Sequence, residues 1–296
     1  MKLSHLLLIV LVSAVTAFAV TTYIVVERAE PKAQTAVAAA KETRLDAVKK
    51  SGVIRCGYIV WPPFLTRDPN TGKFGGMTYD LVEEIGRQLH LKIEWTGEIA
   101  MGQMLADLAL NRYDMICDPF VETPGRAREG DFTLPLFYAP VYLYVRKDDT
   151  RFDNDYARAD RPDIKFAALD GEYSAIAAND DFPDAAKLSL PQMSSAVDLF
   201  MSVAGKKADV VVEDPYAFSD YSAGNPGLLR PAAGSPLHVT ATSMPIPANE
   251  PGFKDMIDHA VAYLQDSGFT DKVLDKYEGS VKFIRPAKAY REPAAP

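Results

Sequence analysis

The chain has 296 residues, 48% of them hydrophobic and 24% charged, which is enough to bury one large core or two smaller ones. Its formal net charge of -8 disfavours a nucleic-acid-binding surface or an anionic-membrane surface, because both need clustered Lys and Arg. The four histidines are scattered and the two cysteines lack Cys-x-x-Cys spacing, so we expect no metal site and no cofactor.

The amino terminus predicts export. Residues 6–26 are almost wholly apolar, and Ala17-Phe18-Ala19 has the small-x-small pattern of a signal-peptidase site. Because the apolar run continues to Val26, a retained membrane anchor stays open beside a cleaved signal peptide. We assign residues 1–26 to this signal or anchor and residues 27–45 to a tether. The folded part is expected in the periplasm or another extracytoplasmic space, touching the inner membrane only through the N-terminal segment.

From residue 53 onward, short β-type runs alternate with helical periodicity, which predicts parallel sheets with crossover helices. The first set comprises strands over 53–58, 91–95 and 114–117, helices over 78–89 and 103–110, and further strands over 132–134 and 141–145. The second set comprises strands over 165–169, 187–190 and 208–212 and helices over 174–179, 194–203 and 214–221. A Pro-rich stretch then predicts irregular chain.

The end of the chain predicts a strand over 238–246 and two helices, over 253–268 and 270–277. We therefore expect an α/β protein of two lobes. Residues 46–144 and 239–283 form the first lobe, 145–238 form the second, and 284–296 are a tail. Because ligands bind beyond the carboxyl ends of such strands, the two sheets should face one another across a cleft.

Five separated motifs resemble the family 3 extracellular solute-binding proteins of ABC importers. The motifs are Tyr58-Ile-Val-Trp61-Pro-Pro-Phe64 with Gly76-Met-Thr-Tyr-Asp80-Leu81, Thr123-Pro-Gly-Arg126, Asp131-Phe-Thr-Leu-Pro-Leu-Phe-Tyr138, Ala208-Asp209 to Asp214, and Asp266-Ser-Gly268 to Lys276-Tyr277. The resemblance implies a two-lobe periplasmic-binding-protein fold of type II, with a mixed sheet flanked by helices in each lobe and a ligand cleft at the hinge. It also implies capture of a small polar, amino-acid-like ligand and its delivery to an ABC transporter permease.

The resemblance assigns the ligand's α-carboxylate to Arg126 and its α-ammonium to Asp214. A guanidinium offers paired donors to a carboxylate, and a carboxylate accepts several bonds from an ammonium group. Outside this context Arg126 reads as a solvated surface residue and Asp214 as a helix N-cap, a role that can coexist with ligand contact. Trp61 occupies the position of the ring that covers the ligand, with a core aromatic as its alternative.

Five further residues complete the candidate site. They are Tyr58, Asp118, Glu122, Thr123 and Tyr173. Residues 118–122 and 171–173 depart from the family pattern, because larger or acidic side chains replace small hydroxyl donors. We therefore expect a ligand other than a standard amino acid bound in the standard way, either one with additional positive charge or a different small polar metabolite.

Two other functions stay open at this point, although we favour a protein without enzymatic activity. An exported enzyme resembling cyclohexadienyl dehydratase would use Glu122 or Glu172 as acid or base, provided that burial raised its pKa. A sensory binding domain would be fixed to the membrane by the N-terminal segment. Cys56 and Cys117 lie on strands expected to be neighbours, so they form either a disulfide or two buried thiols.

Overall fold

The computed structural model describes residues 42–279 and 281–287, and those from Thr43 onward belong to one compact unit. The predicted signal or anchor over 1–26, and the predicted tether as far as residue 41, lie outside the described residues. Within the described ranges, none of the helices combines the length and the apolar character needed to span a bilayer.

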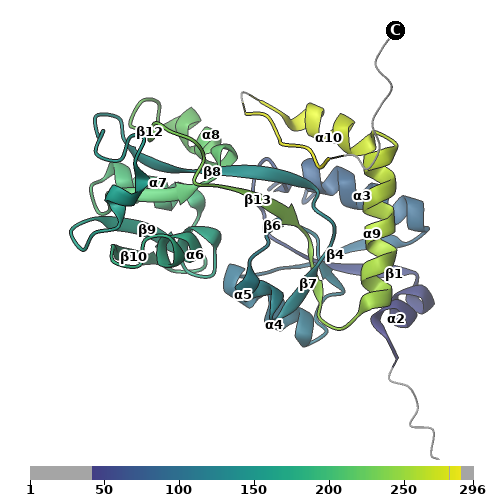
Figure 1. Cartoon of the computed structure of the whole chain (residues 1–296). Coiled ribbons are helices and arrows are strands. Elements are labelled where there is room, and N and C mark those ends of the chain that lie inside the picture. The colour runs from purple at the N-terminus through teal and green to yellow at the C-terminus, as the bar shows by residue number, and fades with distance from the viewer. Residues whose placement is uncertain (1–41, 280, 288–296) are drawn as a thin grey trace, which may run out of the picture. The chain divides into compact units, whose positions relative to one another are not determined.

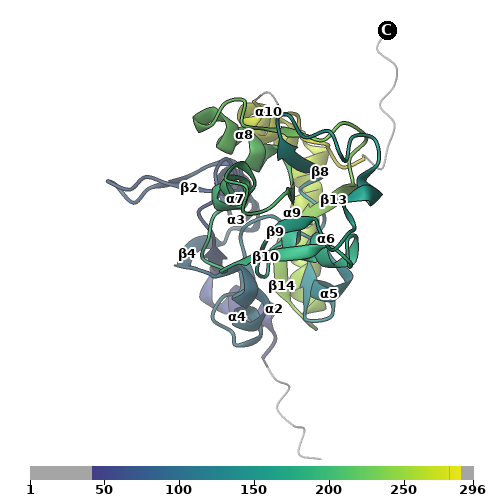
Figure 2. The same cartoon turned by 90° about the vertical axis from the view of Figure 1, so that its left-hand side faces the viewer.

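The first lobe is built on a parallel sheet with the order β4-β1-β5. These strands are β1 (Val53–Tyr58), β4 (Lys92–Glu98) and β5 (Met115–Ile116). The crossover helices are α3 (Met77–Leu89) and α4 (Met104–Ala109), the latter preceded by the 3-10 turn η1 (Met101–Gln103). This confirms the predicted alternation of strands and helices. A short hairpin of β2 (Thr66–Arg67) and β3 (Phe74–Gly75) projects from this lobe (Figure 2).

Helix α2 (Arg44–Ser51) was missed by the sequence analysis. Its N-cap, Thr43, forms a capping box with Asp46, and Gly52 ends the helix in the left-handed conformation. Arg44 and Leu45, which we assigned to the tether, therefore lie in the folded part. Only Arg44 and Val48 are buried in this helix. Its sequence therefore contains no apolar stripe that could have predicted it.

Two long antiparallel strands run between the lobes, β8 (Phe137–Arg146) and β13 (His238–Ser243) (Figure 1). Their register runs from Phe137 opposite Thr242 to Val141 opposite His238. In the first lobe, β13 also pairs with β6 (Phe120–Val121), and in the second lobe β8 pairs with β12 (Leu229–Pro231). The predicted strand over 141–145 thus lies in the C-terminal half of a longer strand, and β12 forms within the stretch predicted as irregular.

The second lobe continues the same sheet in the order β10-β9-β11-β8. Its strands are β9 (Lys165–Leu169), β10 (Ala186–Leu190) and β11 (Val210–Glu213), which are parallel to one another. Its helices are α6 (Tyr173–Asp180), α7 (Ala196–Ala204) and α8 (Pro215–Gly224), with a 3-10 turn η2 (Tyr156–Ala159). Each of these strands and α-helices was predicted to within about three residues, because apolar runs and helical stripes alternate clearly here.

The chain returns to the first lobe through β14 (Pro245–Pro247), which pairs with β7 (Gly130–Phe132). The single strand predicted over 238–246 is wrong. The chain leaves β13 after Ser243, and Pro245, which cannot donate a main-chain hydrogen bond, begins a strand in a different sheet. Likewise, the strand predicted over 132–134 lies two residues earlier, as β7.

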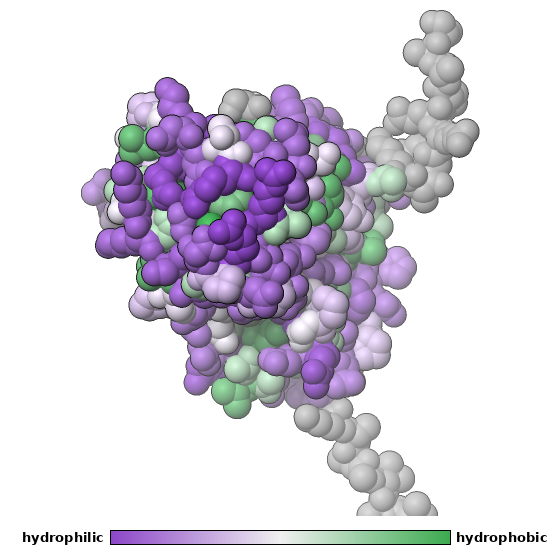
Figure 3. Space-filling view, turned by 60° about the vertical axis from the view of Figure 1, so that its left-hand side comes forward, coloured by the Kyte–Doolittle hydropathy of each residue, from purple (hydrophilic) through white to green (hydrophobic). Residues whose placement is uncertain are grey.

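Helices α9 (Pro251–Asp266) and α10 (Phe269–Tyr277) cover the first lobe. The predicted stripe of α9 is buried at Phe253, Ile257 and Leu264, and each such side chain contributes about 2 kcal/mol by leaving water. Arg285, in the predicted tail, forms an ion pair with Glu278 at 2.7 Å. The described start of the tail is therefore packed against the lobe. The face shown in Figure 3 is mostly hydrophilic, as expected for a surface in water.

Candidate functional site

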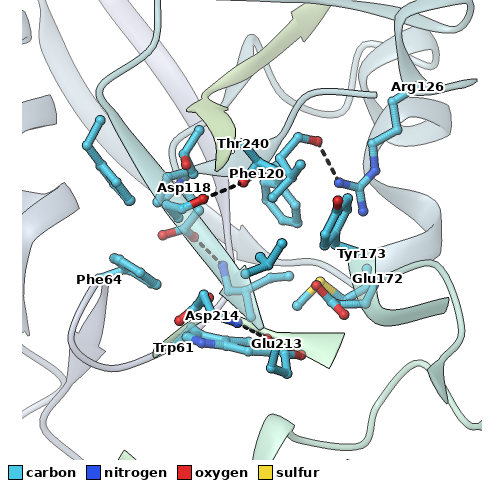
Figure 4. A pocket seen from close by; sticks show the side chains of 18 residues that line it. Trp61, Phe64, Asp118, Phe120, Arg126, Glu172, Tyr173, Glu213, Asp214 and Thr240 are labelled. Atoms are coloured by element: carbon cyan, nitrogen blue, oxygen red, sulfur yellow. Dashed lines mark hydrogen bonds between the residues drawn. The ribbon is translucent and has the colours of Figure 1, made fainter. Parts of the chain in front are cut away.

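A pocket lies where the two lobes meet (Figure 4). The first lobe contributes Trp61, Asp118 and Arg126 to its wall, and the second contributes Glu172, Tyr173, Glu213 and Asp214. Asp118 follows β5, and Asp214 follows β11, so both lie beyond the carboxyl ends of parallel strands. This is the place where α/β sheets bind ligands.

Arg126 belongs to the short helix α5 (Pro124–Ala127), whose N-cap Thr123 accepts a hydrogen bond from Arg126 N at 3.2 Å. The side chain is buried, and its Nη1 donates to Val121 O at 2.8 Å. Its Nη2 donates across the pocket to Gly171 O in the second lobe, also at 2.8 Å. Burial lowers the pKa of Arg126, while the nearby charge of Glu172 raises it. The guanidinium thus joins the lobes through main-chain carbonyls.

Asp214 is both the N-cap of α8 and part of the pocket wall. Its Oδ1 accepts hydrogen bonds from Tyr216 N at 2.8 Å and from Ala217 N at 2.9 Å. Burial and, to a smaller extent, the charge of Glu172 raise the pKa of Asp214 to about 6 against the effect of these two donors. The two roles weighed from the sequence therefore coexist in one side chain.

Glu213, which the sequence analysis missed, is the last residue of β11 and is 4% exposed. Its Oε2 accepts a weak hydrogen bond from Asp214 N at 3.2 Å, and its Oε1 has no hydrogen-bond partner among the described residues. Burial raises the pKa of Glu213 well above its usual value, and the charges of Glu172 and Asp214 add to that effect. Its position gave a signal, because an acidic residue ends an otherwise apolar run at the carboxyl end of a strand.

Asp118 is the corresponding buried acid of the first lobe, also 4% exposed. Its Oδ2 accepts from Ile59 N at 2.6 Å, whereas its Oδ1 has no partner in the described part of the chain. Burial raises the pKa of Asp118 well above its usual value. Glu172, the N-cap of α6, accepts from Ser174 N at 2.6 Å and completes an acidic wall. Four carboxyl groups thus face one guanidinium in this pocket.

Comparison with known proteins now identifies the family. Residues 53–280 match the bacterial extracellular solute-binding proteins, family 3. The chain belongs to this family. The resemblance noted in the sequence, the two-lobe α/β fold of type II and the capture of a small solute are thereby confirmed.

Individual relatives of this solute-binding protein are distant. A Haemophilus influenzae protein named "Probable amino-acid ABC transporter-binding protein" is 24% identical over 61% of this chain and 67% of its own length. The crystal structure of the ancestral amino-acid-binding protein AncCDT-1, described as a precursor of cyclohexadienyl dehydratase, matches with a TM-score of 0.68 and 23% identity. It covers 79% of this chain and 99% of its own. That of AbpA from Streptococcus pneumoniae, bound to L-arginine, matches with a TM-score of 0.66 and 20% identity. It covers 78% of this chain and 97% of its own. At these identities the structures establish a shared fold.

Three predicted site residues of the solute-binding protein do not line the pocket. Tyr58 ends β1 and packs against Phe74 and Trp95 on the other side of the strand, since consecutive side chains point to opposite faces. Glu122 forms a hydrogen bond with the hydroxyl of Ser243 on β13. Thr123 caps α5 and so positions Arg126 rather than facing the pocket. The other five, Trp61, Asp118, Arg126, Tyr173 and Asp214, all contribute to its wall.

Cys56 and Cys117 form a disulfide, with their Cα atoms 5.3 Å apart. It joins β1 to the end of the neighbouring strand β5. Cys117 directly precedes Asp118 in the sequence. Of the two alternatives left open by the sequence, the structure has the bridge. A search of the described side chains finds no cluster of three His, Cys, Asp or Glu residues suited to a metal ion. The carboxyl groups of Glu213 and Glu172 lie close enough to interact, and this interaction contributes to the raised pKa of Glu213.

Proposed function

We propose that this solute-binding protein captures an amino acid between its lobes and delivers it to the permease of an ABC importer. One observation carries the proposal: Arg126 and Asp214, of opposite charge and from different lobes, line the same pocket. Relatives named as amino-acid-binding proteins of ABC transporters, and the L-arginine in AbpA, support an amino-acid ligand.

The proposed pose places the α-carboxylate against Arg126 and the α-ammonium against Asp214. The guanidinium has five N–H donors and gives one from Nη1 and one from Nη2 to main-chain carbonyls, so three remain for a ligand. Asp214 Oδ2 makes no bond to α8, whose donors use Oδ1. Trp61 and Tyr173 cover the ligand with their rings. Closure of the lobes excludes water and strengthens both charged contacts.

The proposal includes release of the ligand unchanged. Glu122, one of the two residues suited to dehydratase chemistry, does not line the pocket, whereas Glu172 does. The substrate of such an enzyme is a cyclic carboxylic acid, which is an anion at neutral pH. One guanidinium would balance its charge, while four nearby carboxyl groups would each have to stay protonated beside it. Incubation with prephenate should accordingly give no phenylpyruvate, and its formation would contradict this part of the proposal.

We also propose where the protein is located and which residues form each of its two lobes. The family is extracellular, and a retained residue 1–26 segment would tether the protein to the outer face of the cytoplasmic membrane. Residues 46–144 and 239–283 would move as the first lobe and 145–238 as the second. The antiparallel pair of β8 and β13, which connects the two groups of residues, supports a hinge within these two strands.

Calorimetric titration of ligand-stripped protein with the common amino acids tests the function. We expect at least one to bind, and Arg126→Ala to weaken that binding by at least about thirtyfold, because a buried charged contact is lost. Arg128→Ala is the matched control, since Arg128 is exposed at the end of the same helix. Failure of every amino acid to bind, or equal effects of the two substitutions, would contradict the proposal.

A further inference from the structure

Three oxygen atoms of the pocket lining lack a hydrogen-bond partner in the part of the chain that the structure describes: the neutral Thr242 hydroxyl and two carboxyl oxygens. The carboxyl oxygens are Asp118 Oδ1 in the first lobe and Glu213 Oε1 in the second. Both side chains line the pocket and are 4% exposed, so bulk water does not replace the missing donors. A buried carboxyl group without donors is costly, and proteins normally pair it or leave it for a ligand.

Within residues 42–279 and 281–287, no side-chain cation pairs with these two carboxyl oxygens. The pocket wall contains no lysine or histidine among the described residues, and its one arginine donates to Val121 O and Gly171 O. The α-ammonium of an ordinary amino acid has three N–H donors, which suffice for the adjacent Asp214 and Glu213. Asp118, on the other lobe, would still be unmatched. A ligand with one positive charge therefore leaves one buried carboxyl group incomplete.

We propose that the ligand carries two cationic groups, one received by Glu213 and Asp214 and the other by Asp118. This rests on the proposed function and narrows it to amino acids with a positively charged side chain. The same wall also includes Ile59, Phe64 and Phe120, which provide apolar surface for the methylene stem of such a side chain. Asp118 and Glu213 are then specificity-determining residues.

Matched ligand pairs test this. Arginine and citrulline have nearly the same shape, but only arginine has a charged side chain; lysine and norleucine form a second pair. We expect the charged member of each pair to bind at least about tenfold tighter in calorimetric titration. Equal affinity within both pairs would show that the ligand needs no second cationic group, while the proposed amino-acid binding would still stand.

Agmatine, which is arginine without its carboxylate, separates the inference from the proposed function. If agmatine bound as tightly as arginine, the proposed contact between the ligand carboxylate and Arg126 would be wrong, but a ligand with two cationic groups would still be supported. Much weaker agmatine binding supports both. If neither arginine, lysine nor agmatine binds, the inference is wrong.

The variant Asp118→Asn tests whether Asp118 receives the second cationic group of the ligand. It keeps the shape of the side chain, so we expect the arginine-to-citrulline affinity ratio to fall towards one with little change in citrulline affinity. Asp163→Asn is the control, because Asp163 pairs with Arg161 on the surface and lies outside the pocket. A purely structural effect would weaken both ligands equally and leave the ratio unchanged, which would overturn the role of Asp118.

Discussion

The two ends of β5 carry aspartates with the same burial and opposite surroundings. Asp114, just before the strand, accepts from Arg44 Nη1 at 2.6 Å and from Arg55 Nη2 at 2.8 Å. Asp118, just after it, accepts one main-chain hydrogen bond and leaves Oδ1 without a partner among the described residues. Burial alone would raise the pKa of both groups, but the bonds from Arg55 and Arg44 lower that of Asp114.

This difference separates a charge that holds the fold from one that serves binding. Asp114 is completed by the protein's own arginines, which come from α2 and β1 and so tie three elements together. Asp118 Oδ1 has no donor among the residues that the structure describes, so a bound ligand would supply one. Burial or charge alone does not distinguish the two roles, whereas the count of satisfied oxygen atoms does.

The disulfide between Cys56 and Cys117, next to Asp118, gives the largest expected effect on stability. It closes a loop across a sequence separation of 61, so replacing both Cys56 and Cys117 by Ala should lower the free energy of unfolding by about 4 kcal/mol. Urea unfolding followed by circular dichroism measures this loss. An unchanged midpoint would show that the strands β1 and β5 are held together without the bridge.

The second prediction compares the aspartates directly. Asp114→Ala should lower the free energy of unfolding by about 3 kcal/mol, because it leaves the buried Arg44 guanidinium without its ion-pair partner. Asp118→Asn should change stability by less than about 1 kcal/mol, because burial raises the pKa of this carboxyl group and the amide keeps the shape of the side chain. The same urea series measures both. If Asp118→Asn were the more damaging change, the proposed division of roles would be wrong.

The third and smallest effect concerns pH. The pKa values of three pocket carboxyl groups are raised, those of Asp118, Glu213 and Asp214. The folded, ligand-free protein therefore binds more protons than the unfolded chain. The contribution of these groups to stability falls as pH rises from about 4 through their folded pKa values. The pKa of Asp214, about 6, lies within this range. Asp114 has the opposite sign: its contribution is present above about pH 4 and is lost as pH falls below.

Binding of a cation needs the ionised carboxyl groups, so affinity for arginine should instead rise as pH increases through the pKa of Asp214, about 6. The rise is up to about tenfold per pH unit for each group that must lose its proton. Titration calorimetry at several pH values measures it, and Glu213→Gln should flatten the profile. An affinity independent of pH in both proteins would refute the link between these carboxyl groups and the ligand.

Sequence patterns predicted most of the second lobe because its strands are short apolar runs between amphipathic helices, as in Lys165–Leu169. They failed where tertiary pairing decides the structure. Strands β6 and β12 consist of two and three residues and exist only because β13 and β8 offer edges to them. Helix α2 is held by a capping box and by Arg44, neither of which makes an apolar stripe.

For the site, motif positions indicated which residues to consider, but not which way they face. Tyr58 and Ile59 are neighbours in sequence, yet only Ile59 lines the pocket, because the direction of each side chain depends on where β1 ends. Glu213 was passed over in favour of the Asp214 beside it. Its missing hydrogen-bond partner is a property of the packed structure, so no sequence pattern could reveal it.

The register of β8 and β13 has a consequence for how this protein can be re-engineered. Val141 and His238 stand opposite each other, and the chain between them forms the whole second lobe. The entry and exit points of that segment are therefore adjacent, about 5 Å apart as in any antiparallel pair. A segment whose two ends meet can be grafted into a related scaffold at a single pair of opposite residues. Such a graft would transfer Glu213 and Asp214 together, while the recipient's own first lobe would replace Arg126 and Asp118.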